Sequence, residues 1–445
     1  MARMFGTDGV RGIANTQLDP ITAFLIGKAS ASLLARGDTG LVVGRDPRHS
    51  GHLLEAAVAA GVMSAGADVL SVDVVTTPAV AFAVRHLGAA GGIMISASHN
   101  PFEYNGIKVF AGDGYKLSDD YEDRVEALVL QGNGALPTPG GTGVGRRRQV
   151  PDVIDWYVDY LAGTCQESLE GLKVAMDCAH GSATGIAPRV FAALGAVVTT
   201  TGSEPDGTNI NVESGSTAPQ KLVGTVKDSG ADLGVAFDGD GDRLIAVDEV
   251  GSIVDGDAIL AICGLDMAGQ GRLSGATVVG TVMSNLGLEL ALRKAGIRLV
   301  RTPVGDRYVL DAMRQHGYRL GGEQSGHLIF LEHATTGDGI LTAVQLASVM
   351  VRTGKRLSEL AAVVERVPQV LLNVRVHARK GVGENEAIRA AVDRAERILG
   401  QQGRVLVRAS GTEPLVRVMV EATDAICAQT MAQELARVVE QELAR

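Results

Sequence analysis

Three short apolar segments of the chain each run directly into a polar loop. Gly92–Ile95 leads into Ser96-Ala-Ser98-His99-Asn-Pro101, Leu233–Phe237 leads into Asp238-Gly-Asp240-Gly-Asp242-Arg243, and Tyr318–Gly322 leads into Glu323-Gln-Ser325-Gly-His327. The loops supply a hydroxyl nucleophile, a group of carboxylates and a set of polar side chains suited to a sugar. We predict that the apolar segments are strands and that their loops together carry out phosphoryl transfer through a phosphorylated serine.

The aspartate loop has the composition of a divalent metal site. Asp238, Asp240 and Asp242 alternate with glycines, and three adjacent carboxylates repel one another unless a cation compensates their charge. Ligands that are all oxygen favour magnesium over zinc. A solvated Asp-Gly turn is the alternative. A calcium-binding EF-hand is rejected because Arg243 stands at loop position six, where that motif needs glycine.

Ser98 is the predicted nucleophile. It has no Gly-x-Ser-x-Gly elbow around it, so a hydrolase triad fits poorly. A phosphate already attached to the hydroxyl would instead be a transferable group, whose charge a metal ion and cationic side chains would stabilise. A loop hydroxyl that caps a helix is the alternative. We expect the adjacent His99 to shape the loop rather than act as a base.

Cationic side chains next to glycines are candidates for binding phosphate. Arg11, Arg45 and Lys108 each have neighbouring glycines that allow close backbone approach to an anion, although each also fits an ordinary surface charge. Near the C-terminus a second set has the composition of a phosphate cradle, in which hydroxyls and backbone N–H groups lie between two guanidiniums. This set consists of Arg408, Ser410, Gly411, Thr412 and Arg417. An ordinary hairpin turn is the alternative.

The order of the elements predicts an α/β protein. Strand-like and helix-like patterns alternate in the first 130 residues, restart at Leu172 and restart again after Gly256. We expect three related α/β domains with mixed or parallel sheets, at 1–150, 151–255 and 256–368, and a smaller α+β domain at 369–445. The segment Gly132–Pro151 is rich in Gly, Pro and Thr and is predicted to be a linker, with the run Arg146–Arg148 on a solvated face.

Composition narrows the class of protein. The 445 residues are 46% hydrophobic and carry a formal net charge of −10, which argues against a nucleic-acid partner. The four cysteines form no C-x-x-C pair, so neither a disulfide framework nor a thiolate metal site is expected. No signal-peptide core and no apolar span of 18 residues is present. We expect a soluble cytoplasmic protein with no membrane partner.

Taken together, these motifs resemble the α-D-phosphohexomutase superfamily over essentially the whole chain. The resemblance rests on Phe5–Gly12, Ile95–Pro101, Thr302–Tyr308 and Gly321–His327, which look like the branch that acts on glucosamine phosphates. It implies four domains around a central cleft and an isomerase that interconverts glucosamine 6-phosphate and glucosamine 1-phosphate. Glucosamine 1,6-bisphosphate would be the intermediate and activator. The product would feed UDP-N-acetylglucosamine and cell-wall synthesis.

The resemblance also implies a role for each motif residue. Ser98 would be the phosphoserine, and one of its phosphate oxygens would join the three aspartates around Mg²⁺. Arg243, with His99 nearby, would contact the phosphoserine, and Glu323 and Ser325 would bind sugar hydroxyls. The C-terminal cradle would hold the substrate phosphate. Arg11, Lys108 and His327 are the candidates for proton handling and charge stabilisation.

Three other functions remain open at this point. The same chemistry could serve glucose or mannose phosphates instead of glucosamine phosphates. A metal-dependent phosphatase would use water as the acceptor, and a catalytically inactive sensor would bind a sugar phosphate without turning it over. The oligomeric state is also open, with a homodimer among the alternatives.

Overall fold

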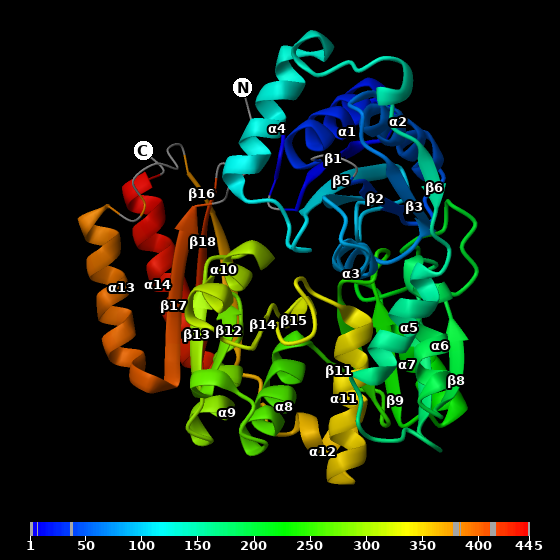
Figure 1. Ribbon diagram of the computed structural model, residues 1–445. Coiled ribbons are helices and arrows are strands. Elements are labelled where there is room, and N and C mark those ends of the chain that lie inside the picture. The colour runs from blue at the N-terminus through cyan, green and yellow to red at the C-terminus, as the bar shows by residue number, and fades with distance from the viewer. Residues whose placement is uncertain are drawn as a thin grey trace.

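The fold consists of four units, each built on its own β-sheet (Figure 1). The computed structural model of the chain describes residues 3–6, 8–35, 39–376, 382, 384–409 and 415–443. The predicted class, three α/β units and a smaller α+β unit, is confirmed. The domain boundaries proposed from the sequence stay a prediction.

The first unit has a six-stranded sheet in the order β1-β5-β4-β2-β3-β6. Its strands are β1 (Val10–Ile13), β2 (Leu41–Arg45), β3 (Val69–Val74), β4 (Gly91–Ile95), β5 (Tyr104–Ala111) and β6 (Arg147–Gln149). Its helices are α1 (Pro20–Leu34), α2 (Gly51–Ser64), α3 (Thr77–Leu87) and α4 (Asp119–Gln131). Strand β2 pairs in parallel with β3 and β4, whereas β5 runs antiparallel to β4. The sheet is therefore mixed. Strands β2 and β4 are buried along their whole length, as expected of strands covered on both faces.

The second unit has a five-stranded sheet in the order β11-β10-β9-β7-β8. Its strands are β7 (Lys173–Asp177), β8 (Val197–Thr201), β9 (Leu233–Phe237), β10 (Leu244–Asp248) and β11 (Ile253–Val254). Its helices are α5 (Val153–Gly163), α6 (Ala187–Ala193) and α7 (Gln220–Ser229). The aspartate loop joins β9 to the antiparallel strand β10, so the chain returns at once into the core after Arg243.

The third unit has a four-stranded sheet in the order β13-β12-β14-β15. Its strands are β12 (Thr277–Thr281), β13 (Arg298–Thr302), β14 (Leu320–Gly322) and β15 (Leu328–Phe330). Its helices are α8 (Gly256–Gly269), α9 (Leu286–Lys294), α10 (Asp306–His316), α11 (Gly339–Thr353) and α12 (Leu357–Ala361). The loop with Glu323 joins β14 to β15 in a tight antiparallel connection.

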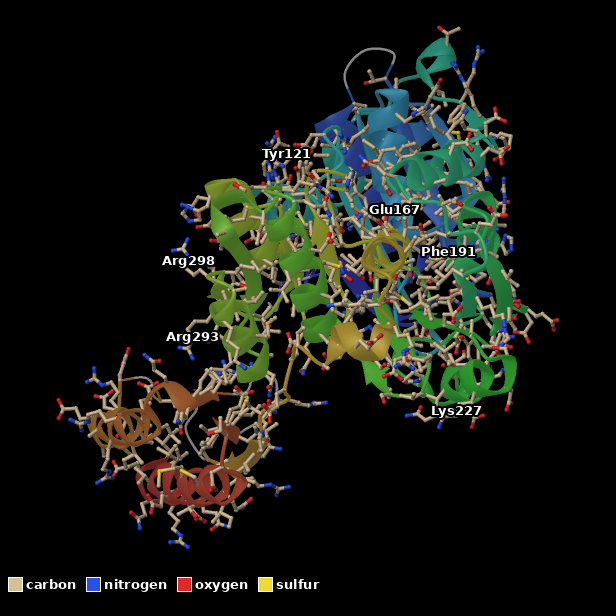
Figure 2. The ribbon with its side chains drawn as sticks, turned by 90° about the horizontal axis from the view of Figure 1, so that it is seen from below. Tyr121, Glu167, Phe191, Lys227, Arg293 and Arg298 are labelled. Carbon is tan, nitrogen blue, oxygen red and sulfur yellow. The ribbon has the colours of Figure 1, made fainter. Side chains whose placement is uncertain are left out.

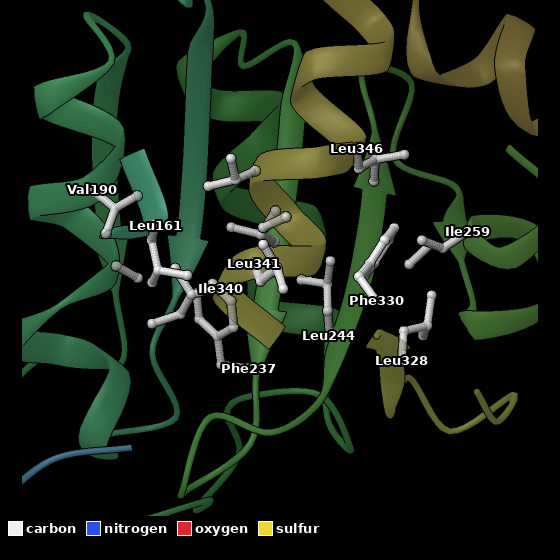
Figure 3. Close-up of a cluster of buried hydrophobic side chains, with 14 of the residues drawn as sticks. Leu161, Val190, Phe237, Leu244, Ile259, Leu328, Phe330, Ile340, Leu341 and Leu346 are labelled. Atoms are coloured by element: carbon white, nitrogen blue, oxygen red, sulfur yellow. The ribbon is translucent and has the colours of Figure 1, made fainter. Parts of the chain in front are cut away.

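One large hydrophobic core connects the first three units. Helix α11 belongs to this core, and every residue from Gly339 to Met350 is buried. Figure 3 shows its Ile340 and Leu341 in one cluster with Phe237 of β9 and Leu244 of β10. Because this helix packs against both the second and the third unit, it holds the aspartate loop and the Glu323 loop in fixed relative positions.

The C-terminal unit is a three-stranded antiparallel sheet with its own core. It contains β16 (Gln369–Arg375), β17 (Gly403–Ala409), β18 (Leu415–Ala422), α13 (Glu386–Leu399) and α14 (Ala425–Leu443). Figures 1 and 2 both show it at one side of the molecule, next to the third unit. The buried Glu421 carboxylate connects the two units by accepting hydrogen bonds from Asn285 Nδ2 at 3.1 Å and from the backbone N–H of Leu286 at 3.0 Å.

The prediction that Gly132–Pro151 is a linker is wrong in one respect. Within Gly132–Pro151, Arg147–Gln149 form an edge strand, β6, which pairs in parallel with β3. The strand is exposed, as predicted for the arginine run, but Arg147 and Arg148 form ion pairs with Glu55 at 2.6 Å and Asp68 at 2.7 Å. A short, polar edge strand carries no apolar alternation, which is why its pattern was missed.

Candidate active site

The serine loop and the aspartate loop meet at the carboxyl ends of β4 and β9. Ser98 Oγ donates a hydrogen bond of 2.5 Å to Asp238 Oδ2, and both side chains are buried. The third loop begins at the carboxyl end of β14 and contributes Glu323 and His327 to a pocket beside them. The arrangement follows from the topology, because open α/β sheets place ligands at the carboxyl ends of their strands.

The serine loop is held by a buried arginine that sequence reasoning did not single out. Arg48 donates hydrogen bonds of 2.8 Å to the carbonyl oxygens of Ser98 and Asn100, and its Nε is 2.8 Å from Asp46 Oδ2. Asn211 of the second unit donates to the same Ser98 carbonyl at 3.0 Å. These bonds fix Ser98 in the left-handed region, with a φ of 53°, which a serine adopts only at some cost. The Arg48 side chain also donates to the carbonyl oxygens of Pro101 and Tyr104, which makes five hydrogen bonds that its local sequence does not predict.

The interpretation of Arg45 as a phosphate-binding cation is wrong. Its guanidinium is buried and paired with Glu55 at 2.9 Å and with Asp73 at 2.7 Å. Arg45 therefore stabilises the first unit from inside, and the neighbouring glycine reflects close packing rather than an anion site.

The three aspartates form a group that fits a metal ion. One ligand atom from each of Asp238, Asp240 and Asp242 lies within 4.8 Å of the others, and all three side chains are buried. Burial and the charges of Asp242 and Asp240 raise the pKa of Asp238 well above its ordinary value. Asp240 Oδ1 and Asp242 Oδ1 are buried without a hydrogen-bond partner. Buried acceptors of this kind are costly unless a cation satisfies them, so the residues present fit a divalent ion.

Lys108 lies against the aspartates. Its Nζ is 2.8 Å from Asp240 Oδ2 and 3.3 Å from Asp242 Oδ2, and the side chain is 2% exposed. Burial lowers the pKa of this ammonium, but Asp240, Asp8 and Asp242 raise it well above its ordinary value. These carboxylates therefore favour the charged form of the side chain. Lys108 is on β5, opposite Met94 of β4, the strand that leads into the serine loop.

A pocket of about 460 Å³ opens beside this cluster and is lined by six of the predicted site residues: Arg11, His99, Asp242, Arg243, Glu323 and His327. Its lining comes from the N-terminal segment and from all three loops: Arg3, Met4, Gly6, Asp8, Gly9, Arg11, His99, Asp242, Arg243, Val304, Gly305, Asp306, Glu323 and His327. Glu323 is oriented by the backbone N–H of Gly305, which donates to its Oε1 at 3.1 Å. Ser325 is exposed and does not line the pocket. Among these residues, Asp8 and Asp306 were not identified from the sequence.

The pKa values of His99 and His327 are shifted in opposite directions. His99 Nδ1 lies 3.3 Å from Ser98 Oγ, and burial, together with Arg243 and Arg11, lowers the pKa of His99 to about 4. His99 is therefore neutral near neutral pH. Burial also lowers the pKa of His327, but Asp242, whose Oδ1 is 3.7 Å from Nδ1, outweighs it and raises that pKa above its ordinary value.

Arg243 is the cation that follows the aspartates. It lines the pocket, and its Nε is buried without a hydrogen-bond partner. Burial lowers the pKa of this guanidinium, yet Asp242, Asp238 and Glu323 raise it. A charged group with an unused donor in the lining of this pocket suits an anionic oxygen.

The predicted phosphate cradle is only partly described. Ser410, Gly411 and Thr412 lie outside the described residues. Arg408 of β17 and Arg417 of β18 are cross-strand partners, and burial and the charge of Arg417 lower the pKa of Arg408. Arg408 Nη2 is 4.0 Å from Met283 Sδ of the third unit. Neither arginine lines the 460 Å³ pocket.

The site combines a buried serine, a group of three aspartates that fits a metal ion, and a pocket lined by several cationic side chains. This combination is that of a phosphoryl-transfer enzyme. Four family models match the chain: phosphoglucomutase/phosphomannomutase alpha/beta/alpha domain I at residues 2–134, domain II at 155–251, domain III at 255–367, and the C-terminal domain at 371–438. The chain belongs to the phosphoglucomutase/phosphomannomutase family, which confirms the resemblance predicted from its motifs.

Relatives match over the full length. The phosphoglucosamine mutase of Desulforudis audaxviator is 56% identical over 441 residues, which cover 99% of this chain and 98% of that protein. That of Symbiobacterium thermophilum is 54% identical over 447 residues, covering both proteins completely. A crystal structure of a phosphoglucomutase/phosphomannomutase family protein from Burkholderia thailandensis superposes with a TM-score of 0.84 at 27% identity, covering 99% of this chain and 97% of that one.

Proposed function

We propose that the chain is a mutase that interconverts glucosamine 6-phosphate and glucosamine 1-phosphate through a phosphoserine and a 1,6-bisphosphate. Its product would supply UDP-N-acetylglucosamine and cell-wall synthesis. Identity above 50% with phosphoglucosamine mutases over the whole chain supports the substrate. The observation that carries the chemistry is the hydrogen bond from Ser98 Oγ to Asp238 at the edge of a cation-lined pocket.

In this proposal Ser98 carries the transferable phosphoryl group. Asp238, Asp240 and Asp242, with an oxygen of that phosphoryl group, would hold Mg²⁺, which when bound offsets the negative charge that develops during transfer. Arg243 and Lys108 place two further positive charges beside the three aspartates. Lys108, which contacts Asp240 and Asp242, is a candidate for charge stabilisation and for proton handling.

The reaction proceeds in two transfers of opposite direction. The bond between Ser98 Oγ and phosphorus breaks as O1 of glucosamine 6-phosphate bonds to phosphorus, and the O1 proton leaves to a nearby base. The phosphoryl group on O6 then returns to Ser98 Oγ, and O6 regains a proton. Because one serine serves both ends of the sugar, the bisphosphate must turn around within the site between the two transfers.

Proton handling falls to the side chains that line the pocket beside Ser98. Arg11, Lys108 and His327 are the proposed candidates; Arg11 of the first unit and His327 of the third unit line the pocket. His99 touches Ser98 Oγ and is neutral, which suits it to orient the serine hydroxyl. Glu323 is proposed to bind sugar hydroxyls, with Ser325 beside it.

Other features remain predictions from the sequence. Among the described residues, no helix is both long and apolar enough to cross a membrane. The cytoplasmic location and the oligomeric state, with a homodimer among the alternatives, stay predictions. So do the roles of glucosamine 1,6-bisphosphate as activator and of Mg²⁺ as the resident ion.

A rate comparison on three sugar phosphates tests the proposed substrate. We expect kcat/KM to be highest for glucosamine phosphates, compared with glucose and mannose phosphates, and free phosphate to be released negligibly during turnover. A higher kcat/KM for glucose or mannose phosphate would mean that this sugar phosphate, and not glucosamine phosphate, is the substrate. Stoichiometric release of phosphate would instead identify a phosphatase.

Substitution of Arg417 and of Glu323 separates phosphate binding from sugar recognition. Arg417→Ala should weaken binding of both glucosamine 6-phosphate and glucosamine 1-phosphate. In the proposed function each isomer presents its phosphate to the C-terminal phosphate cradle that contains Arg417, while its free hydroxyl faces Ser98. The loss of one charge-assisted pair is worth about 1.5–3 kcal/mol, or roughly ten- to a hundredfold. Glu323→Ala should reduce discrimination among sugars at nearly unchanged phosphate affinity. Steady-state constants on glucosamine and glucose phosphates decide, and the reverse pattern would reverse the two assignments.

A further inference from the structure

The Asp8 carboxylate forms ion pairs with three cationic side chains: Arg11, Lys108 and Lys116. Its Oδ2 is 3.0 Å from Lys108 Nζ and also accepts a hydrogen bond from Arg11, while its Oδ1 is 2.5 Å from Lys116 Nζ. Burial raises the pKa of this carboxyl, but Lys108, Lys116 and Arg11 together hold it well below the ordinary value. No proposed role in the reaction uses this carboxylate, although it lines the active-site pocket.

The backbone holds Asp8 firmly against the strand that carries Lys108. The next residue, Gly9, has a φ of 82°, and a Cβ atom there would lie 2.4 Å from the carbonyl oxygen of Ile107 in β5. Only glycine allows this approach. The turn therefore brings the Asp8 carboxylate to Lys108 by close contact between main chains, independently of the side-chain charges.

Asp8 differs from the other carboxylates around Lys108. Lys108 Nζ contacts Asp240 Oδ2 and Asp242 Oδ2, which belong to the group that fits a metal ion. Lys108 and a bound cation thus compete for the same two carboxylates. Asp8 is outside that group, so it binds Lys108 without giving up a metal ligand.

The same carboxylate connects the serine loop and the third unit. Arg11, paired with Asp8, donates from Nη1 to Asn100 Oδ1 of the serine loop at 3.1 Å. Lys116 bridges Asp8 to Asp306 Oδ2 at 2.5 Å, at the start of α10. The side chains of Lys116 and Asp306 are 10% and 14% exposed, so this bridge between two units is well shielded from solvent.

We infer that Asp8 is a positioning residue, which holds Arg11 against the serine loop and shares Lys108 with the metal-binding aspartates, so that Lys108 competes less strongly with a metal ion for them. The inference rests on the proposed mutase function. Among the described residues, the other carboxylates that Lys108 contacts are Asp240 and Asp242, so without the Asp8 charge Lys108 opposes metal binding more strongly. Arg11 also loses the carboxylate that aims it. The reaction step should suffer more than substrate binding.

The test compares Asp8→Asn, Asp8→Glu and the control Asp120→Asn, whose carboxylate is exposed on α4. Steady-state kinetics on glucosamine 6-phosphate and calorimetric titration with Mg²⁺ are measured for each. For Asp8→Asn we expect kcat to fall about 10- to 100-fold, KM to change by less than about threefold, and Mg²⁺ to bind about tenfold more weakly. Asp8→Glu should recover part of both losses, and the control should match the wild type.

Each other outcome has a defined meaning. Unchanged kcat and Mg²⁺ affinity in Asp8→Asn overturn the inference, as does a rise in KM alone. Thermal unfolding of the metal-free variants shows whether they fold. If Asp8→Asn does not fold, Asp8→Glu carries the test, and wild-type kcat and Mg²⁺ affinity in that variant overturn the inference. A wild type without mutase activity refutes the proposed function, while the Mg²⁺ titrations still decide the role of Asp8.

Discussion

Ser98→Ala should abolish mutase activity while the protein stays folded. The hydroxyl is the proposed carrier of the phosphoryl group between the two transfers, so its removal eliminates covalent catalysis and should lower kcat by about 10³-fold or more. The fold should tolerate the change because the loop keeps the hydrogen bonds that Arg48 donates to the Ser98 and Asn100 carbonyls. Asp238 also keeps the backbone N–H of Arg243 as a donor at 3.1 Å.

The matched control is Ser229→Ala, at the exposed end of α7 in the second unit. Intact mass with peptide mapping should find one phosphoryl group on Ser98 of the wild type and none at that position in the variant. If the Ser98→Ala protein kept more than about a tenth of the wild-type rate, the phosphoserine assignment would be wrong.

The serine and aspartate loops were predictable because each motif follows a continuous apolar strand. Gly92–Ile95 and Leu233–Phe237 match buried strands almost residue for residue. Their loops could therefore be placed at the edge of a sheet, and the chemistry followed from residue type. The same reasoning succeeded in the C-terminal unit, where amphipathic α13 and α14 cover an antiparallel sheet.

Residues that act through long-range contacts were beyond this reasoning. Arg48 and Arg45 stand three residues apart in one motif, yet one holds the serine loop and the other forms a buried pair with Glu55. Nothing in their local sequence distinguishes the two roles, because the partners of each come from distant segments. Asp8 was missed for the same reason. Its three cationic partners are Arg11 of β1, Lys108 of β5 and Lys116, which follows β5. Only the folded chain brings the three together.

A divalent cation should be required for activity and should bind at the aspartate loop. Removal of metal with EDTA should lower turnover to background, and addition of Mg²⁺ should restore it. Asp240→Asn removes one charge from the group, and the orphaned Oδ1 becomes part of an amide. We expect this variant to bind Mg²⁺ more weakly and to lose at least about 100-fold in kcat.

Asp240 also holds Thr77 and Lys108, whose Oγ1 and Nζ lie 2.5 Å and 2.8 Å from Asp240 Oδ2. A purely structural loss would therefore lower the unfolding temperature without altering Mg²⁺ affinity among the folded molecules, and calorimetry separates the two effects. Asp228→Asn, exposed on α7, is the control. Zinc should substitute poorly, because it prefers tetrahedral sites with nitrogen and sulfur ligands. Full activity after exhaustive EDTA treatment would contradict a metal role for the three aspartates, and neighbouring side chains, among them Lys108, Arg243 and His327, would then have to relieve their mutual repulsion.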